Sequence, residues 1–130
     1  MKTNSLLLAA AFALTTPLFL LPQGAMAQAN RNLLPQQGGE ALYKGICQDC
    51  HMPDGRGAEG AGHYPALAKN PKLAEAGYPL TVVTNGLKSM PAFGGALSDQ
   101  QIADVVNYVR SHFGNTYKDK LKPEDVKNAR

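Results

Sequence analysis

The chain has 130 residues, with 13 basic and 10 acidic side chains and a formal net charge of +3 at pH 7. This length predicts about one domain, and such mild basicity argues against a nucleic-acid partner, which normally requires a clustered basic patch. The chain contains no tryptophan and only two cysteines, Cys47 and Cys50. So close a pair leaves a local disulfide, a metal site and a cofactor attachment as candidates.

Residues 1–27 have the layout of a secretory signal peptide. Lys2 supplies a positive charge, the apolar run 6–21 follows, and Ala25-Met26-Ala27 offers a small-x-small cleavage site. The apolar run is shorter than the about 20 residues that a membrane-spanning helix needs. We therefore expect cleavage after Ala27 and export to the periplasm, with no transmembrane span afterwards. A retained membrane anchor is the alternative.

Residues 28–38 are polar and rich in turn formers, so we expect a flexible leader there. From Gly39 to Cys50 the apolar side chains recur at helical spacings, which predicts a short amphipathic helix. Four glycines between His51 and Gly62 predict an irregular loop.

The middle of the chain predicts shorter helical pieces. Between Pro65 and Tyr78 we expect one or two helical turns around Leu67 and Leu73. Residues 80–87 have the composition of a strand. We nevertheless expect a short helix that ends at Gly86, because no second strand is expected nearby for pairing.

The clearest helix lies near the C-terminus. Ser98 is a suitable N-cap with Gln101 as its capping-box partner, and Gly114 is suited to end the helix. A single buried stripe follows the cap at helical spacing, formed by Ile102, Val105, Val106, Val109 and Phe113. Residues 115–130 are predicted to form a charged tail, in which Pro123 can begin one more turn.

The decisive motif is Cys47-Gln48-Asp49-Cys50-His51. On a helix, side chains three and four residues apart share one face. Two thiols on that face can add to the two vinyl groups of one haem, and the adjacent imidazole then reaches the iron. This pattern is known as a c-type haem attachment site, so the sequence predicts one covalent haem c with His51 as axial ligand.

Other uses of the cysteines fit less well. A thioredoxin-like pair needs a βαβ setting and a helix N-terminus that activates the first thiol, whereas this pair ends a helix in a chain expected to lack strands. A structural zinc site needs about four ligands that surround the ion, and no second cluster is present. A bare disulfide leaves His51 unexplained.

The second axial ligand has several candidates. Met52 adjoins His51 and cannot reach the opposite face of a haem, and His112 is expected to be a surface residue of the last helix. Met90 and His63 remain. We favour Met90, because it precedes Pro91 in a loop too rich in glycine and proline for regular structure. A methionine that only fills the core usually lies on a helix or strand, and such a loop can carry its side chain across the face of a haem. A His/Met iron suits electron transfer and has no open site.

At this point the chain resembles the class I cytochrome c family. The resemblance spans about residues 39–114 and rests, in order, on the haem motif, Tyr64-Pro65-Ala66-Leu67, Met90-Pro91-Ala92-Phe93 and the helix 104–110. It implies an all-α fold in which three to five short helices surround one covalent haem.

The resemblance also implies particular contacts within that fold. The carbonyl of Pro65 should accept a hydrogen bond from Nδ1 of His51, and Gly39 and Tyr43 should cross the terminal helix near Val105 and Tyr108.

A narrower resemblance, carried by the Met90 motif, Tyr108-Val109-Arg110 and the tail from Asn115, is to cytochrome subunits of bacterial periplasmic dehydrogenases. Many of those carry three haem motifs, and this chain has one. We therefore expect a non-enzymatic electron carrier between a dehydrogenase and an oxidase or another cytochrome, monomeric or part of a hetero-complex.

A dedicated dehydrogenase subunit is the alternative, and an enzyme or gas sensor with an open haem face is a third interpretation. Lys88 is a candidate to guide an acidic partner to the haem edge, and Arg56 to neutralise a haem propionate.

Overall fold

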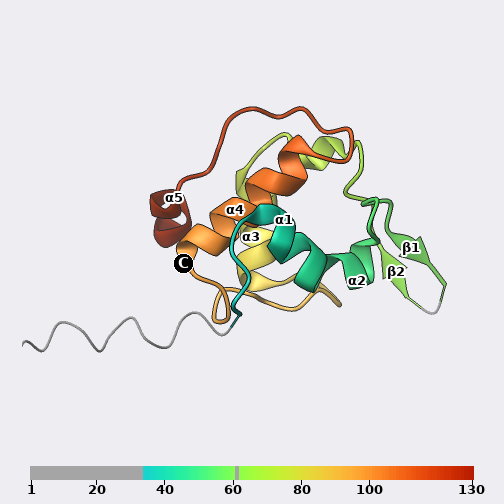
Figure 1. The fold of residues 1–130 in the computed structure, drawn as a ribbon, viewed down its shortest axis with the longest axis horizontal. Coiled ribbons are helices and arrows are strands. Elements are labelled where there is room, and N and C mark those ends of the chain that lie inside the picture. The colour runs from blue at the N-terminus through green and yellow to red at the C-terminus, as the bar shows by residue number, and fades with distance from the viewer. Residues whose placement is uncertain (1–33, 61) are drawn as a thin grey trace, which may run out of the picture.

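The structure, a computed structural model, describes residues 34–60 and 62–130 (Figure 1). The predicted signal peptide and residues 28–33 of the predicted leader lie outside the described residues. The helices are α1 (Gly39–Leu42), α2 (Gln48–His51), α3 (Gly77–Asn85), α4 (Asp99–Ser111) and α5 (Pro123–Asn128), with a π turn at Tyr43–Cys47, a 3₁₀ turn at Pro71–Leu73 and the short strands β1 (Ala58–Glu59) and β2 (His63–Tyr64). In the described part of the chain, no helix combines the length and the apolar character that crossing a membrane requires.

The expected helix from Gly39 to Cys50 is present as α1, the π turn and α2 in direct succession. It crosses α4 at Gly39, where a Cβ atom would lie 2.3 Å from the carbonyl oxygen of Asp104 and 2.5 Å from Cβ of Tyr108. Only a glycine permits so close a crossing. The approach that the resemblance implied is therefore confirmed, one turn of α4 packing directly on the first turn of α1.

The hydrophobic core lies where α1, α3, α4 and α5 meet. Its buried members come from these helices, from the π and 3₁₀ turns and from the loop before α4. They include Leu42, Tyr43, Leu73, Leu80, Leu97, Ile102, Val105, Val106, Val109 and Val126. The predicted stripe of α4 is confirmed as buried, except that Phe113 is only partly covered. Burial of this stripe stabilises α4 despite its β-branched residues, which are poor helix formers.

The helix predicted before Gly86 is confirmed as α3. Gly86 has a φ of +76° and its N–H bonds the carbonyl of Val82, so it ends the helix. Around Leu73 the predicted turn is present as the 3₁₀ turn, with the Asn70 side chain as its N-cap. The turn expected around Leu67 is not formed.

The start of α4 is as predicted, with the full capping box of Ser98 and Gln101. The prediction that α4 ends at Gly114 was wrong, since the helix ends at Ser111. The carbonyls of the last turn find other partners: Ser111 Oγ donates to the carbonyl of Asn107 and His112 Nδ1 to that of Tyr108. The carbonyls of Val109 and Arg110 also find partners, in the side chain of Asn115 and the N–H of Tyr117, so the early end leaves most of the last turn bonded.

The prediction of a chain without strands was also wrong in one place. Residues 58–59 and 63–64 form a two-stranded antiparallel sheet, with Ala58 opposite Tyr64 and Glu59 opposite His63. At Gly57, where φ is +68°, a Cβ atom would lie 2.0 Å from the carbonyl oxygen of Tyr64. The glycines that predicted an irregular loop are what allow the two segments to approach each other.

The segment 115–130 folds back over α4, as the red trace in Figure 1 shows. Val126 of α5 is fully buried. The Asn107 side chain donates to the carbonyl of Leu121 and accepts from its N–H, both at 2.9 Å. The predicted extra turn at Pro123 is thus α5, and the charged composition of this segment concealed the few apolar residues that pack on the core, Tyr117, Leu121 and Val126.

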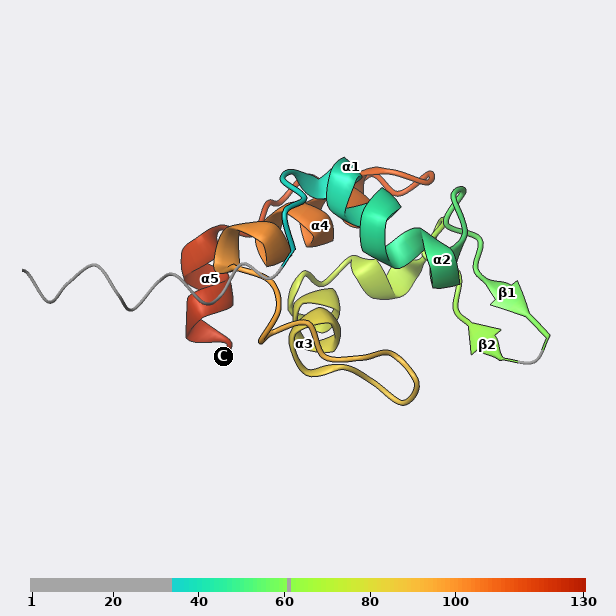
Figure 2. The same ribbon diagram turned by 60° about the horizontal axis from the view of Figure 1, so that its bottom comes forward.

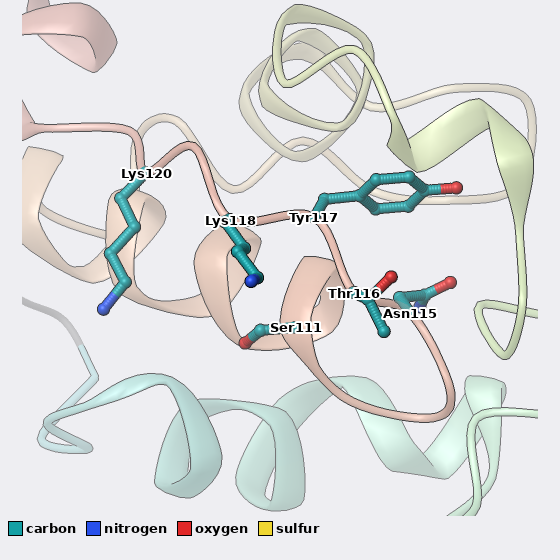
Figure 3. Close-up of a pocket in the computed structure, with 6 residues that line it drawn as sticks. All are labelled: Ser111, Asn115, Thr116, Tyr117, Lys118 and Lys120. Carbon is teal, nitrogen blue, oxygen red and sulfur yellow. The ribbon is translucent and has the colours of Figure 1, made fainter.

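A hollow of about 370 Å³ lies beside the 115–120 segment. It is lined by Ser111, Asn115, Thr116, Tyr117, Lys118 and Lys120 and contains no residue of the haem motif (Figure 3).

The residues before α1 contact the first turn of α4. The buried Gln101 side chain donates to the carbonyls of Leu34 and Gln36. The last residues of the predicted flexible leader are therefore held against α4, which their polar composition did not indicate.

Candidate haem-binding site

The two cysteines and the histidine of the motif lie at the end of the first helical segment. Cys47 closes the π turn, and Cys50 and His51 belong to the last turn of α2. Both thiols are free, Cys50 being exposed and Cys47 partly buried. A π turn is uncommon and often marks a functional site, because it changes the direction in which the following side chains point.

The thiols do not have the chemistry of a redox-active pair. Burial, and then the neighbouring Cys50, raise the pKa of the Cys47 thiol to about 11. A thioredoxin-like site instead lowers the pKa of its first thiol at a helix N-terminus, and this pair lies at a helix C-terminus. The Cys47 thiol, whose pKa is raised, is therefore protonated at neutral pH, unlike the activated thiol of a redox pair.

His51 is fixed on its side chain and on its backbone. Its Nδ1 lies 2.9 Å from the carbonyl oxygen of Pro65. Because a carbonyl only accepts, Nδ1 carries the proton and Nε2 keeps a free lone pair, the arrangement usual for a metal-binding imidazole. The carbonyl of His51 accepts from the N–H of Gly57 at 3.0 Å. The residue is only 8% exposed, so its ring has little freedom to turn.

The backbone after His51 is held by Tyr43. Its hydroxyl donates to the carbonyl of Met52 at 2.7 Å, and Met52 itself has a φ of +65°. Burial raises the pKa of Tyr43 to about 12, so the phenol remains a donor throughout the physiological range. This contact directs the chain away from α2 immediately after the imidazole.

Met90 lies in the loop between α3 and α4. It exchanges two backbone hydrogen bonds with Leu87, at 2.9 and 3.1 Å, across a tight turn in which Lys88 has a φ of +54°. Figure 2 shows this loop, yellow to orange, extending below α2. Among the described residues no hydrogen bond joins Met90 to the Cys47–His51 motif, and its side chain is only partly buried.

The other histidines occupy different environments. His63 is on β2, largely exposed, with its Nδ1 3.4 Å from a carboxylate oxygen of Glu59. His112 is exposed as predicted, and its ring stacks on that of Tyr108 at 4.0 Å between centroids. Arg56, considered above as a partner of a propionate, is exposed and pairs with Asp54.

The donor set of this region fits a covalently attached haem. It offers two free thiols three residues apart, an imidazole with one nitrogen already bonded to a carbonyl, and a thioether on a separate loop. Three large apolar side chains, Tyr64, Tyr78 and Leu87, are 38%, 43% and 48% exposed. In residues 34–60 and 62–130 no group of three or more His, Cys, Asp or Glu side chains is arranged to hold a bare metal ion.

Comparison with known proteins identifies the family of the chain. The family described as "Cytochrome C oxidase, cbb3-type, subunit III" matches residues 35–109, more than half of the chain. The chain belongs to this cytochrome c family. Members of the family use haem c, and the all-α class I fold and the non-enzymatic electron-transfer role predicted above are thereby confirmed.

Relatives of this cytochrome include dehydrogenase subunits. The fructose dehydrogenase cytochrome subunit of Gluconobacter japonicus is 36% identical over 68% of this chain and 21% of its own length. The gluconate 2-dehydrogenase cytochrome c subunit of Pantoea cypripedii is 34% identical over 72% of this chain and 24% of its own. The cytochrome thus spans about a quarter or less of these relatives.

A third relative has a different length. Cytochrome c6 of Bumilleriopsis filiformis is 39% identical over 58% of this chain, and the match covers 88% of that protein. The matched domain therefore also occurs as nearly a whole protein.

Sequence reasoning predicted the motif residues and the contact of Pro65 with His51, which the structure contains, but it missed the residues that orient them. Tyr43 was expected only as an apolar contact, and Gly57 only as a loop residue. A glycine six residues after the histidine gives no signal of the strand pairing that it permits. A tyrosine eight residues before the histidine likewise gives no signal of the backbone carbonyl that it bonds.

Proposed function

We propose that the protein is a periplasmic one-electron carrier. It holds a single haem c through thioethers to Cys47 and Cys50, with His51 and Met90 as axial ligands. It takes electrons from a periplasmic dehydrogenase and passes them to a respiratory acceptor. The observation that carries the proposal is the prepared imidazole of His51, whose Nδ1 bonds the Pro65 carbonyl at 2.9 Å beside two free thiols.

Each residue has a distinct role in this proposal. The thiols of Cys47 and Cys50 anchor the cofactor on the helix, and His51 binds iron through Nε2. Pro65 and Gly57 hold the imidazole and its backbone, so its position changes little between oxidation states. A bound haem supplies the reversible one-electron chemistry, and the protein sets its potential through ligands and burial.

Met90 is proposed as the second ligand because of where it lies. Its turn is held at Leu87 on one side, and the loop returns to α3 through the N–H groups of Phe93 and Gly94. His63, the competing candidate, is largely exposed and faces Glu59 from the outer strand of the small sheet. A sulfur ligand raises the reduction potential and leaves no open coordination position.

Export and partner choice complete the proposal. We propose that residues 1–27 are a signal peptide removed after Ala27, which places the mature protein in the periplasm. Lys88, exposed at the tip of the Met90 turn, is proposed to guide an acidic surface of a redox partner by charge complementarity. The relatives that are dehydrogenase cytochrome subunits support a dehydrogenase as the electron donor.

A second candidate function is a dedicated cytochrome subunit of a periplasmic dehydrogenase. The identity to fructose and gluconate dehydrogenase subunits favours it, whereas the nearly full coverage of cytochrome c6 favours the free carrier. Purification of the matured protein from its own cells separates them. A stoichiometric complex that survives high salt identifies a subunit, and a free monomer identifies a carrier.

The ligand assignment is tested on holoprotein matured in a periplasm. Intact-mass analysis should show one haem added to the chain that begins after residue 27. The oxidised protein should show the weak red absorption band of iron bound by sulfur, and the reduced protein should not bind carbon monoxide rapidly at neutral pH. Met90→Ala should abolish the band and open the iron to carbon monoxide.

His63→Ala is the matched control and should leave both properties unchanged. If Met90→Ala leaves the spectrum intact and His63→Ala alters it, His63 is the ligand. If the parent protein binds carbon monoxide rapidly, the iron has an open face and the carrier function is excluded.

A further inference from the structure

We propose that Arg130 is a positioning residue for the sulfur ligand. Its guanidinium binds residues 91–98, the part of the loop that leads from Met90 to α4 and is called the limb below. These contacts reduce the frequency with which the loop opens. The inference rests on the proposed function, because it takes Met90 as the second axial ligand.

The guanidinium contacts three acceptors in one short stretch. Arg130 Nε donates to a carboxylate oxygen of Asp99 at 2.6 Å, and Nη2 donates to the carbonyl of Leu97 at 2.8 Å. Nη1 donates to the carbonyl of Gly94. Both side chains of the ion pair are mostly buried: that of Arg130 is 20% exposed and that of Asp99 is 26% exposed. A planar guanidinium can serve such divergent acceptors at once, and an ammonium cannot.

Two of these acceptors, the carbonyls of Gly94 and Leu97, lie on the limb that leads from Met90 to α4, and Asp99 is the first residue of α4. Among residues 34–60 and 62–130, the backbone of Met90 is hydrogen-bonded only to Leu87, within its own turn, so contacts of other residues hold the rest of the loop. On one side the limb is hydrogen-bonded to α3: the N–H of Phe93 donates to the carbonyl of Val83 at 2.9 Å, and the N–H of Gly94 donates to that of Thr84 at 3.0 Å. Gly94 thus bonds α3 through its N–H and Arg130 through its carbonyl.

Arg130 follows a helix that is itself fixed. Val126 of α5 is fully buried in the core beside α4. The Asp125 carboxylate accepts from the N–H of Lys122 and closes the first turn of α5. The guanidinium is therefore presented from a rigid support, and its loss frees the limb on one side without removing core contacts.

Loops of this kind open locally while the rest of a protein stays folded. An external ligand such as imidazole can bind oxidised iron only when Met90 has left it. Its apparent affinity is therefore proportional to the open population. In oxidised holoprotein, Arg130→Gln should raise the apparent affinity for imidazole about tenfold, because charge-assisted hydrogen bonds to the limb are lost. The reduction potential should fall at the same time, since sulfur ligation keeps it high.

Two variants serve as controls. Lys127→Gln removes a positive charge from an exposed position of α5, the helix that precedes Arg130, and should bind imidazole like the parent. Arg130→Lys keeps a charge opposite Asp99 but cannot reach both carbonyls, so its affinity should fall between those of the parent and Arg130→Gln.

The outcomes separate the inference from the function on which it rests. If Met90→Ala abolishes the red band while Arg130→Gln binds imidazole like the parent, the inference fails and the ligand assignment stands. A lower unfolding midpoint with unchanged imidazole affinity also overturns it, because that result describes a purely structural residue. If the parent lacks the red band and Met90→Ala binds imidazole like the parent, the ligand assignment fails and takes the inference with it.

Discussion

Arg110 is fully buried in α4, and its Nη2 lies 2.8 Å from both carboxylate oxygens of Asp119 in the segment that follows the helix. The same guanidinium donates to the carbonyls of Leu73 and Ala74, each at 2.8 Å. One side chain therefore joins the 3₁₀ turn, α4 and the returning segment. A buried charge is tolerated here because most of its donors have acceptors.

The first prediction concerns the stability that this residue provides. Arg110→Met should lower the free energy of unfolding by about 3 kcal/mol, because the carbonyls that it serves lose charge-assisted hydrogen bonds. Arg110→Lys should lower the free energy of unfolding by less, because one ammonium can reach some of the acceptors but not all of them. Denaturant unfolding of the holoprotein followed by circular dichroism measures both. An Arg110→Met protein as stable as the parent would contradict the joining role.

The second prediction concerns pH. The hydrogen bond from Arg110 lowers the pKa of Asp119 below its ordinary value of 3.8. A carboxyl whose pKa is lowered on folding adds stability above its unfolded pKa, and this stability is lost as pH falls through the folded pKa. Asp119→Asn should therefore be less stable than the parent at neutral pH, and the difference should vanish below pH 3.8 as the parent's carboxyl becomes protonated.

Unfolding midpoints measured from neutral to acidic pH test this. Glu75→Gln, at an exposed carboxyl on another segment, is the control and should run parallel to the parent. A constant difference between Asp119→Asn and the parent at all pH values would show that the carboxylate charge is not what matters.

The sequence predicted those parts of the fold that depend on neighbours in the chain. The capping box of Ser98 and Gln101, the buried stripe of α4 and the stop at Gly86 are local patterns, and all are present. The attachment motif is likewise contiguous. Local chemistry decides such features, so a single sequence is sufficient to predict them.

Part of what escaped prediction depends on contacts between distant segments. The side chain of Asn115 donates to the carbonyls of Leu67 and Val109 and accepts from the N–H of Asn70, which are 48, 6 and 45 residues away. A charged, polar composition around Asn115 gave no sign of this. The early end of α4 and the small sheet escaped for a different reason: their backbone partners lie within a few residues along the chain, but no local sequence pattern marked them.

The third prediction tests the crossing of α1 and α4. Gly39→Ala should lower the free energy of unfolding by about 2 to 3 kcal/mol, because its Cβ would overlap the backbone of Asp104 and the two helices must separate. Gly77→Ala, at the start of α3 with no atom within 4 Å of the added Cβ, is the control. It should be neutral or stabilise by up to about 1 kcal/mol, since alanine favours helix over glycine.

Denaturant unfolding of the two alanine variants and the parent gives the comparison. Equal stability of Gly39→Ala and Gly77→Ala would show that the helices are not in the close contact described here.

The fourth prediction links the small sheet to the iron ligand. Gly57 has a positive φ, and its neighbours leave no room for a Cβ beside the carbonyl of Tyr64. Gly57→Ala should therefore displace the 64–65 segment and weaken the hydrogen bond from His51 to Pro65. An imidazole that no longer donates to a carbonyl is a weaker electron donor. The reduction potential should consequently rise, and stability should fall by about 2 kcal/mol or more.

Gly60→Ala provides the matched control, because it lies in the same turn with no atom within 4 Å of the added Cβ and no positive φ. Its potential and stability should equal those of the parent. Spectroelectrochemical titration of both variants measures the potential, and denaturant unfolding measures the stability. If Gly57→Ala is destabilised while its potential stays at the parental value, the sheet supports the fold alone. In that case Pro65 keeps its contact with His51 by other means, and the glycine has no influence on the redox site.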